Sequence, residues 1–305
     1  MNEIDKLITT AYRAALQAGS EILKVYESDD FSVERKDDDS PLTRADRRAH
    51  EVIEAALAQT GVPRLSEEGA DIPAVERQQW ELYWLIDPLD GTKEFIKRNG
   101  EFTVNIALMA PAEQSAAGQP EGHAPVAGVV YVPVKDVAYV GVQGRGAWKI
   151  EGAAEKAAKA DPAATAKTGE VQPAGGQVPE DLAGIENVGV KLPAQDPQTR
   201  PFSAVMSRSH NSPETEAYVA DLEQQFGPAE RVSSGSSIKL CLVAEGAADV
   251  YPRFAPTMEW DTAAGDAVCR AAGCRVSEKD GTTPLRYNKT DLLNPWFLVQ
   301  GPRII

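Results

Sequence analysis

Cysteine and histidine are scarce in this chain, with three residues of each among 305. The cysteines are odd in number, and the spacing of Cys241, Cys269 and Cys274 is not that of a zinc site. Neither a disulfide framework nor a cysteine-based metal centre is therefore expected to organise the fold. Free thiols are typical of a reducing compartment, so we expect a cytoplasmic protein.

Positive charge is also in short supply. The chain has 31 Lys and Arg residues against 46 Asp and Glu residues, which gives a net charge of −15. So acidic a protein is not expected to coat a nucleic-acid polymer. An anionic small-molecule substrate would need metal ions or a few clustered basic residues to bind here.

Long hydrophobic runs are missing. No stretch approaches the length of a membrane span, and acids occur early in residues 1–6, so we expect neither a transmembrane segment nor a signal peptide. The composition, 42% hydrophobic and 25% charged, is that of a globular protein. A length of 305 residues allows one large domain or two smaller ones.

The most informative stretch is Trp84–Thr92, which reads W-L-I-D-P-L-D-G-T. Its apolar start predicts a buried strand whose last residue, Asp87, turns a carboxylate into a cleft. We expect Pro88 to end that strand, because proline has no N–H for the ladder.

A tight turn after Asp87 would bring Asp90 to the same place. Gly91 allows the backbone to approach a ligand closely, and the Thr92 hydroxyl can hold a water or a phosphate oxygen. Two carboxylates this close repel each other unless a cation lies between them. Oxygen ligands suit Mg²⁺ or Mn²⁺ rather than zinc, so the motif predicts a site for one of these ions.

Two other interpretations of the motif stay open at this point. Asp and Gly are also common in ordinary turns. A class of phosphatases with an Asp nucleophile uses a D-x-D-G-T loop, but here the two Asp residues are three positions apart rather than two, which argues against that class.

The segments before this motif are predicted to be helical. Hydrophobic periodicity indicates amphipathic helices over residues 4–26 and over residues 40–61. Thr43 and Asp46 share a face at the start of the second helix, where Asp46 is either a favourable acid or a functional group. Glu67 and Glu68 follow a short strand, and at most one of these adjacent acids is expected to reach Asp87 and Asp90.

Short β-rich runs separated by Gly and Pro predict an antiparallel meander after Thr92. These runs are residues 103–109, 126–132, 137–142 and 147–150. Residues 151–201 then become rich in Ala, Gly, Pro and Lys, and we interpret them as a surface insertion with a short helix over 153–160. The chemistry predicted here does not need that insertion.

Regular structure is expected to resume at residue 202, with a strand over 203–206 and a helix over 214–226. Residues 233–239 then form a Ser- and Gly-rich loop that opens a helix. Exposed N–H groups at such a helix start, together with Lys239, could seat a phosphate, although most loops of this kind are plain connections.

The last quarter of the chain carries two further candidates. A strand over 249–254 contains Arg253, and a helix begins near Asp261, which we expect at its N-cap. An Asp at that position is more often a simple helix cap than a metal ligand. Residues 295–299 are predicted to be a buried strand.

Taken together, the motifs E-E, W-L-I-D-P-L-D-G-T and W-D-T-A-A-G resemble those of the lithium-sensitive, Mg²⁺-dependent inositol monophosphatase superfamily. Within it, S-R-S-H, G-S-S-I-K-L-C-L-V-A-E-G and Y-P-R-F are similar to its 3′(2′),5′-bisphosphate nucleotidase branch of CysQ type. The resemblance covers residues 1–150 and 202–305. The departures are the insertion and the pair Met258-Glu259 before Trp260, which leave lid behaviour and substrate tolerance open.

The resemblance implies the fold: a layered αβαβα sandwich, with an α+β part over residues 1–150, the insertion over 151–201 and an α/β part over 202–305. It also implies two or three Mg²⁺ ions, replaceable by Mn²⁺. The implied metal ligands are Glu67, Asp87, the carbonyl of Leu89, Asp90 and Asp261. Glu67 and Thr92 would hold the attacking water, and Asp46 would help orient it or serve a further metal site.

The implied substrate is a small nucleotide bisphosphate, adenosine 3′,5′-bisphosphate (PAP), cleaved to AMP and phosphate, with the sulfated form PAPS as a second substrate. Gly91 and Thr92 would meet the scissile phosphate. The rest of the nucleotide would contact Ser207, His210, Gly235, Ser237, Lys239 and Arg253. Family members are monomers or homodimers, and some associate with the inner face of the membrane, although no basic amphipathic segment supports that association here.

Two rival functions remain. The same chemistry could act on inositol monophosphate or fructose 1,6-bisphosphate, but Arg208, His210, Lys239 and Arg253 provide more positive charge than a single phosphate requires. A metal-binding regulator without catalysis is the other alternative. The presence of the full carboxylate set argues against it.

Overall fold

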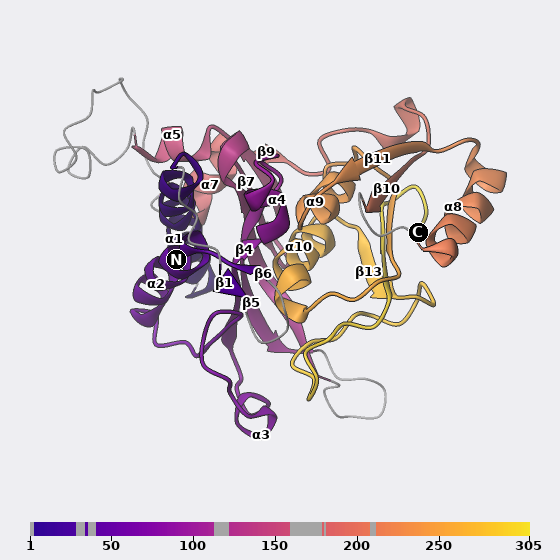
Figure 1. Cartoon of the computed structure of the whole chain (residues 1–305). Helices are drawn as coiled ribbons and strands as arrows, with labels where there is room; N and C mark the ends of the chain where they lie inside the picture. Colours follow the sequence, from indigo (N-terminus) through magenta and orange to yellow (C-terminus); the bar gives the residue numbers. More distant parts are fainter. Residues whose placement is uncertain are drawn as a thin grey trace.

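The computed structural model describes residues 3–28, 34–35, 41–112, 122–158, 179, 181–207 and 212–305. Helices and sheets alternate in five layers (Figure 1). Helices α1 and α2 form one outer layer, a seven-stranded sheet follows, α9 and α10 lie in the middle, and a five-stranded sheet and α8 complete the stack. The predicted αβαβα sandwich is confirmed.

The outer helices at the N-terminal side are those that the periodicity predicts. Helix α1 spans Glu3–Tyr26 and α2 spans Arg44–Ala58. On the apolar stripe of α1, Ile8 and Ile22 are fully buried, and Ile4 and Tyr26 at its two ends are partly buried against the same core. Helix α2 is capped by Thr43, whose hydroxyl accepts the N–H of Ala45.

The large sheet has the strand order β3-β4-β5-β6-β7-β8-β9. Only β3 and β4 run parallel, and each later neighbour pairs antiparallel, so the predicted meander is confirmed. The strands are β3 (Arg64–Ser66), β4 (Tyr83–Asp90), β5 (Thr103–Pro111), β6 (His123–Val132), β7 (Val137–Val142), β8 (Gly146–Glu151) and β9 (Val190–Lys191).

The second half of the expected insertion differs from the prediction. Helix α5 (Ala153–Ala158) follows β8 as expected, but α7 (Leu182–Val188) buries Leu182 and Ile185 in the same core as α1. Strand β9 then pairs with β8 and extends the large sheet. Residues 181–191 therefore belong to the fold, because Leu182 and Ile185, one helical turn apart, pack into the same core as α1. Residues 159–178 and 180 lie outside the described part of the chain.

The middle layer positions the site. Helices α9 (Ile238–Ala244) and α10 (Glu259–Ala271) pack between the two sheets. Helix α10 lies close to the large sheet because β6 and β7 present Gly128 and Gly141 to it. A Cβ at Gly141 would lie 2.6 Å from the Cα of Val268, and one at Gly128 would lie 2.7 Å from the carbonyl oxygen of Ala264. The glycines thus fix how deep α10 sits.

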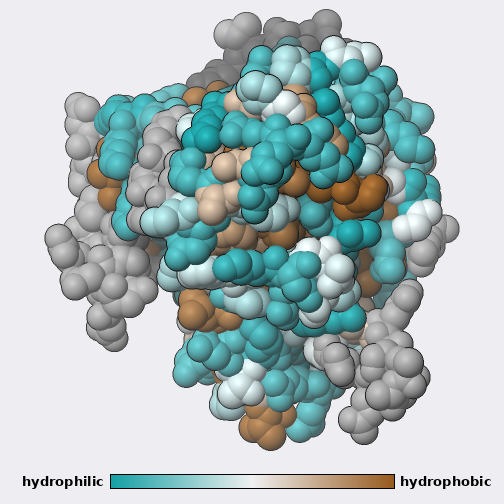
Figure 2. All heavy atoms as spheres, turned by 90° about the vertical axis from the view of Figure 1, so that its right-hand side faces the viewer, coloured by the Kyte–Doolittle hydropathy of each residue, from teal (hydrophilic) through white to brown (hydrophobic). Residues whose placement is uncertain are grey.

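The smaller sheet has the order β11-β10-β12-β14-β13 and is covered on its far face by α8 (Pro213–Phe226). Figure 2 shows that this side of the molecule is mostly hydrophilic, with scattered hydrophobic residues. The strand predicted over 295–299 begins two residues later, at Phe297, and Trp296 lies before it with 38% exposure. The strands are β10 (Ser203–Ser207), β11 (Glu230–Ser234), β12 (Val250–Arg253), β13 (Arg275–Glu278) and β14 (Phe297–Gln300).

One apolar core joins the two halves of the chain. Side chains of the large sheet, such as Tyr83 and Leu85, share a buried cluster with Leu240 of α9 and Val268 of α10.

The short elements are β1 (Glu34–Arg35), β2 (Pro41–Leu42), α3 (Ala74–Arg77), α4 (Thr92–Ile96), η1 (Pro133–Lys135) and η2 (Pro197–Thr199). None of the helices in the described ranges combines the length and apolar character that crossing a bilayer requires.

Candidate active site

Strand β4 carries the central motif, but Pro88 does not end it. The strand continues to Asp90, with Asp87 opposite Asn105 and Asp90 opposite Thr103 on β5. Three steps along β4 therefore match two along β5, which is a β-bulge. The bulge leaves Pro88 outside the regular ladder, so its missing N–H costs no hydrogen bond. The expected end of the strand at Asp87 is wrong for this reason.

The bulge places the carboxylates of Asp87 and Asp90 beside that of Asp261, which comes from the other half of the chain. Oxygen atoms of Asp87, Asp90 and Asp261 all lie within 4.8 Å of one another. Asp87 is buried, and the other two are half-buried. The predicted acids of β4 and α10 therefore meet in one place.

The electrostatics of this carboxylate cluster are unfavourable without a cation. Burial raises the pKa of Asp87 well above its usual range, and the charges of Glu67, Asp90 and Asp261 raise it further. Burial followed by the charge of Asp90 has the same effect on the pKa of Asp261. An all-oxygen set of crowded acids fits a hard divalent cation. Such a cation would offset both the cost of burying the charged carboxylates and their mutual repulsion.

Glu67 rather than Glu68 is the acid that joins this cluster. It follows β3, and its backbone N–H donates to the carbonyl of Ile86 over 3.1 Å, which anchors it beside β4. Its side chain is close enough to raise the pKa of Asp87 by charge and by a hydrogen bond. The expectation that one of the two adjacent acids reaches Asp87 agrees with this arrangement.

Asp46 and Thr92 lie on the N-terminal side of the cluster. The Thr92 hydroxyl is 3.4 Å from Oδ1 of Asp46 and 3.5 Å from the carbonyl oxygen of Leu89. The other oxygen of Asp46 accepts the backbone N–H of Thr43 at 2.8 Å and its hydroxyl at 2.5 Å. Burial raises the pKa of Asp46 to about 7, although the hydrogen bonds from Thr43 lower it. Asp46 is thus both a helix-capping acid and a neighbour of Thr92.

Asp261 is not the N-cap that the sequence suggested. Helix α10 begins at Glu259 after an N-cap at Met258, so Asp261 is in the first turn. Its Oδ2 accepts the backbone N–H of Met258 over 2.9 Å. The capping residue could not be found from local preference, because the loop that holds Met258 comes from residues 286–294.

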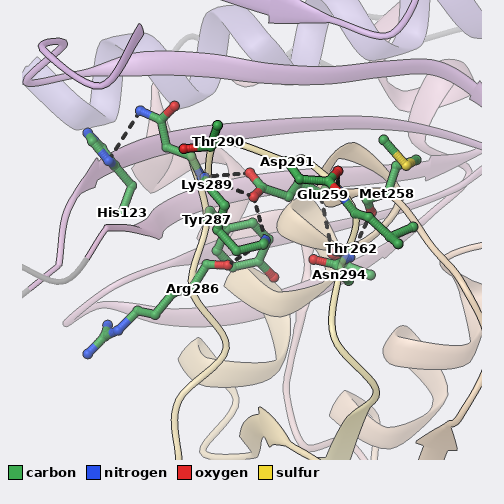
Figure 3. A network of polar contacts seen from close by, with 12 residues as sticks. His123, Met258, Glu259, Thr262, Arg286, Tyr287, Lys289, Thr290, Asp291 and Asn294 are labelled. Atoms are coloured by element: carbon green, nitrogen blue, oxygen red, sulfur yellow. Dashed lines mark hydrogen bonds and ion pairs between the residues drawn. The ribbon is translucent and has the colours of Figure 1, made fainter. Parts of the chain in front are cut away.

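That loop clasps the start of α10 (Figure 3). Glu259 is fully buried, and its carboxylate accepts the N–H of Asn288 at 2.6 Å and Nζ of Lys289 at 2.5 Å. The Asn294 amide donates to the carbonyl of Met258 over 2.8 Å. Asn288 also accepts Nη1 of Arg77 over 2.7 Å, so the clasp ties α10 to the N-terminal half. Sequence reasoning missed this role of Glu259.

The turn before α9 supports the carboxylates from the other side. The backbone N–H of Ser237 donates to Oδ2 of Asp90 over 2.7 Å, and its hydroxyl donates to the carbonyl of Asp261 over 2.5 Å. Asn105, buried in β5, donates to the Ser237 hydroxyl at 2.9 Å. Ser237 is 1% exposed, so the structure places it behind the cluster rather than on a cavity wall. The only sequence signal for Asn105 was a polar residue inside an apolar strand.

A cavity of about 280 Å³ opens beside the carboxylates. Asp90 and Asp261 line it, together with the predicted residues Gly91, Gly235, Lys239 and Arg253. Gly91 has φ +94°, a left-handed conformation that favours glycine at this turn. The N–H of Gly235 donates to the Glu101 carboxylate over 2.9 Å. This glycine therefore lets a ligand come close to the backbone but offers it no free N–H donor.

Lys239 is the most deeply buried cation of this cavity, with 8% exposure. Its Nζ donates to the carbonyl of Ser236 over 2.7 Å and lies 5.6 Å from the centre of the Tyr251 ring. Burial lowers the pKa of Lys239 to about 8, while the nearby charge of Asp90 raises it. Lys93 and Lys97 also line the cavity. Their signal was two lysines one turn apart directly after the D-G-T turn.

Two predicted nucleotide contacts cannot be placed against this cavity. Ser207 closes β10, and His210 lies outside the described residues. Both stay predictions. The other candidates gather around a single cavity and carboxylate cluster at the junction of β4, α4, α9 and α10.

Comparison with known proteins places this arrangement in a family. The inositol monophosphatase family model matches residues 3–300. The 3′(2′),5′-bisphosphate nucleotidase CysQ of Salmonella typhimurium is 43% identical over 289 residues, which are 93% of this chain and 96% of that protein. The CysQ protein of Escherichia coli K12 is also 43% identical, over 290 residues with the same coverage.

Solved structures agree. The crystal structure of CysQ from Bacteroides thetaiotaomicron, a bacterial member of the inositol monophosphatase family, has a TM-score of 0.77 and 49% sequence identity, with 96% of each chain covered. The extragenic suppressor protein suhB of Bartonella henselae shares the fold, with a TM-score of 0.62 at 21% identity, covering 98% of this chain and 94% of that one. The chain belongs to the inositol monophosphatase family.

Proposed function

We propose that the protein hydrolyses the 3′-phosphate of PAP to give AMP and phosphate, and that PAPS is a second substrate. It is a phosphoric monoester hydrolase, a 3′(2′),5′-bisphosphate nucleotidase. The observation that carries this proposal is one cavity lined both by carboxylates of the cluster, Asp90 and Asp261, and by the buried Lys239. A substrate with two phosphate groups needs both features.

The charge distribution supports a bisphosphate rather than a monophosphate. One phosphate would lie at the carboxylate cluster with the metal ions. Lys239 and Arg253 line the remainder of the cavity, and Lys93 and Lys97 add two further cations. Glu94 also lines the cavity, but in a chain with a net charge of −15 four basic side chains around one cavity still favour a second anionic group.

The family is metal-dependent, and the oxygen-only cluster fits Mg²⁺, with Mn²⁺ as a substitute. Two or three ions would be held by Glu67, Asp87, the Leu89 carbonyl, Asp90 and Asp261. When bound, they would neutralise charge that develops on the phosphoryl group and lower the pKa of a coordinated water.

The chain's own groups would position that water. The Thr92 hydroxyl can donate to Asp46 or to the Leu89 carbonyl, which leaves its oxygen to accept one hydrogen bond from the water while Glu67 accepts another. Attack in line with the leaving oxygen would then need no phosphorylated residue. Gly91 would let the scissile phosphate approach the backbone of the turn.

The nucleotide side of the proposal rests on Lys239 and Arg253, with Gly235, Ser207 and His210 as further contacts. We assign Ser237 a different role from the one expected. Because its N–H donates to the Asp90 carboxylate and its hydroxyl to the backbone carbonyl of Asp261, it orients Asp90 and holds the start of α10 rather than touching the nucleotide. We also infer a cytoplasmic location, with which the three buried free cysteines agree.

The test is phosphate release from PAP and from inositol 1-phosphate, with Mg²⁺ and again with Li⁺. We expect PAP to be preferred and lithium to inhibit. Asp90→Asn should lower kcat by roughly a hundredfold or more, since a cation held by that carboxylate supplies several kcal/mol. Asp221→Asn, which makes the same chemical change on the exposed face of α8, should have no effect.

Each other outcome has a clear meaning. Preference for the inositol ester would keep the metal site and remove the nucleotide assignment. Near-normal turnover by Asp90→Asn would show that the carboxylate cluster does not hold the catalytic metal. An absence of turnover with either substrate would favour a metal-binding regulator.

A further inference from the structure

A second and larger cavity lies at the other end of α10. It has a volume of about 720 Å³ and is formed by the β7–β8 hairpin, the last turns of α10 and the segment around Pro284. Asp261 in the first turn of α10 lines the candidate active site, whereas Ala267 and Ala271 near its end line this second cavity. The two cavities share no lining residue.

Basic side chains alone provide the charge of this basic groove, which we define by Arg145, Lys191, Arg270 and Arg286. Among the described residues, no Asp or Glu lines it. The chain as a whole has 46 acids against 31 bases, so such a segregation runs against the overall composition. A concave surface lined by one sign of charge concentrates ions of the opposite sign.

Two of the four cations are already neutralised within the protein. Arg270 is held by the buried Asp266, with Nε–Oδ1 and Nη2–Oδ2 distances of 2.6 and 3.0 Å. Arg145 contacts Glu186 over 2.8 Å. These pairs fix the groove's walls but contribute little net charge to an incoming ligand.

The other two cations, Lys191 and Arg286, have no ion-pair partner within the described ranges. Arg286 lies next to Tyr287, whose hydroxyl donates to Asp266 over 2.8 Å. Figure 3 shows the Arg286 side chain extending away from the contacts of Glu259. Its backbone is thus anchored while its guanidinium is available, and guanidinium groups match the geometry of phosphate and sulfate oxygens.

Apart from Gln143, Gly144 and Gly146, the rest of the lining comes from apolar residues, with Pro111, Pro125, Val126 and Pro284 among them. Such a surface suits the carbon skeleton of a ligand, and the volume lies within the range of small-molecule pockets. We propose that the basic groove is a second binding site, for a small organic phosphate or sulfate whose anionic group contacts Lys191 and Arg286. The proposal does not depend on the identity of the substrate at the first site.

The test is calorimetric titration with AMP and, separately, with inorganic phosphate, in EDTA so that divalent metal makes no contribution. We expect AMP to bind more tightly than phosphate, because only AMP covers the apolar lining. The double variant Lys191→Glu/Arg286→Glu should bind AMP at least tenfold more weakly. Lys135→Glu, the same charge change on an exposed turn outside both cavities, should bind AMP like the unmodified protein.

Lys239→Ala separates the two sites. AMP bound in the candidate active site would be lost in that variant, whereas AMP bound in the basic groove would be retained. Turnover of PAP should be unchanged in the double variant, which also shows that it folds. If it does not fold, Lys191→Gln/Arg286→Gln replaces it with the same expectation. Binding that resists both charge changes, binding that Lys239→Ala abolishes, or no binding at millimolar AMP would overturn the proposal.

Discussion

Ser237 donates its backbone N–H to the Asp90 carboxylate over 2.7 Å, and so joins the turn before α9 to the end of β4. The same residue reaches the carbonyl of Asp261 through its hydroxyl. One residue, through its backbone N–H and its hydroxyl, therefore links acids that are separated by 171 residues in sequence (261 − 90). Its burial, at 1% exposure, keeps water from competing for these bonds.

The first prediction concerns that hydroxyl. Ser237→Ala keeps the backbone bond to Asp90 but removes the hydrogen bond to the Asp261 carbonyl. It also leaves the Asn105 amide with only its longer contact, 3.4 Å to Oδ2 of Asp90. A hydrogen bond of this kind contributes about 1 kcal/mol, so the Mg²⁺ concentration for half-maximal activity should rise roughly fivefold. Titrating Mg²⁺ against phosphate release measures it.

Ser277→Ala provides the control for Ser237→Ala. Ser277 is equally buried, and its hydroxyl has no hydrogen-bond partner within the described part of the chain. This variant should leave the Mg²⁺ dependence as it is. Equal shifts in both variants would mean that burial of a hydroxyl, rather than its link to Asp261, sets the effect.

The second prediction concerns the pH dependence of substrate capture. Burial lowers the pKa of Lys239 to about 8, so the free protein loses this charge as pH rises through that value. An anionic substrate then loses a charged donor, and kcat/KM for PAP should fall with a midpoint near pH 8. The profile of kcat/KM from pH 6.5 to 9.5 measures this.

Lys239→Met tests the origin of that midpoint. The variant should have kcat/KM lower by about tenfold to a hundredfold, from loss of a charge-assisted hydrogen bond, and should lack the inflection. An inflection that persists in Lys239→Met belongs to another group.

The free energy of unfolding should change with pH in the opposite direction to kcat/KM. Between pH 8 and 10.5 the unfolded chain binds a proton at Lys239 that the folded chain does not, so the contribution of Lys239 to stability rises with pH.

The third prediction concerns the clasp at the start of α10. Lys289→Met removes the only ammonium that contacts the buried Glu259 carboxylate within the described residues, and leaves that charge with backbone donors alone. Loss of one partner of a buried pair costs several kcal/mol. Because the Lys289 side chain is 31% exposed, we expect a smaller decrease in the free energy of unfolding, about 2 kcal/mol. Urea denaturation without metal measures it.

A double variant shows whether the two residues act as a pair. Glu259→Gln/Lys289→Met should lose less stability than the sum of its single changes. Lys135→Met, on an exposed turn, should stay within about 0.5 kcal/mol of the unmodified protein. Strict additivity of the two losses would mean that Glu259 and Lys289 do not stabilise the clasp together.

Local features of the chain were readable from the sequence. The periodicity of residues 4–26 predicted α1, and the alternation of short apolar runs with Gly and Pro predicted the meander from β5 to β8. The acids of W-L-I-D-P-L-D-G-T indicated the carboxylate cluster, because their spacing within one turn already brings them close. Family resemblance added Asp261, which no spacing could connect to Asp87.

Other features depended on long-range contacts. Pro88 lies within β4 because the pairing with β5 contains a bulge at that point. The conformational preferences of neighbouring residues do not predict how a distant strand pairs. Asp261 is in the first turn of α10 because a loop from residues 286–294 holds Met258 at the cap. Helix α7 packs Leu182 and Ile185 into the core that it shares with α1, and the exposed strand β9 extends the sheet by pairing with β8. Both depend on partners that the composition of this segment does not indicate.

The sequence by itself determined which side chains could hold a divalent cation and which helices and strands would carry them. These properties follow from residue chemistry and from periods of a few residues along one element. The tertiary structure alone decided that Ser237 supports the carboxylates, that Glu259 anchors α10, and that four basic residues line a second groove. Those roles depend on which distant segments pack together, and the local residue pattern around a polar or charged side chain does not specify its distant partner.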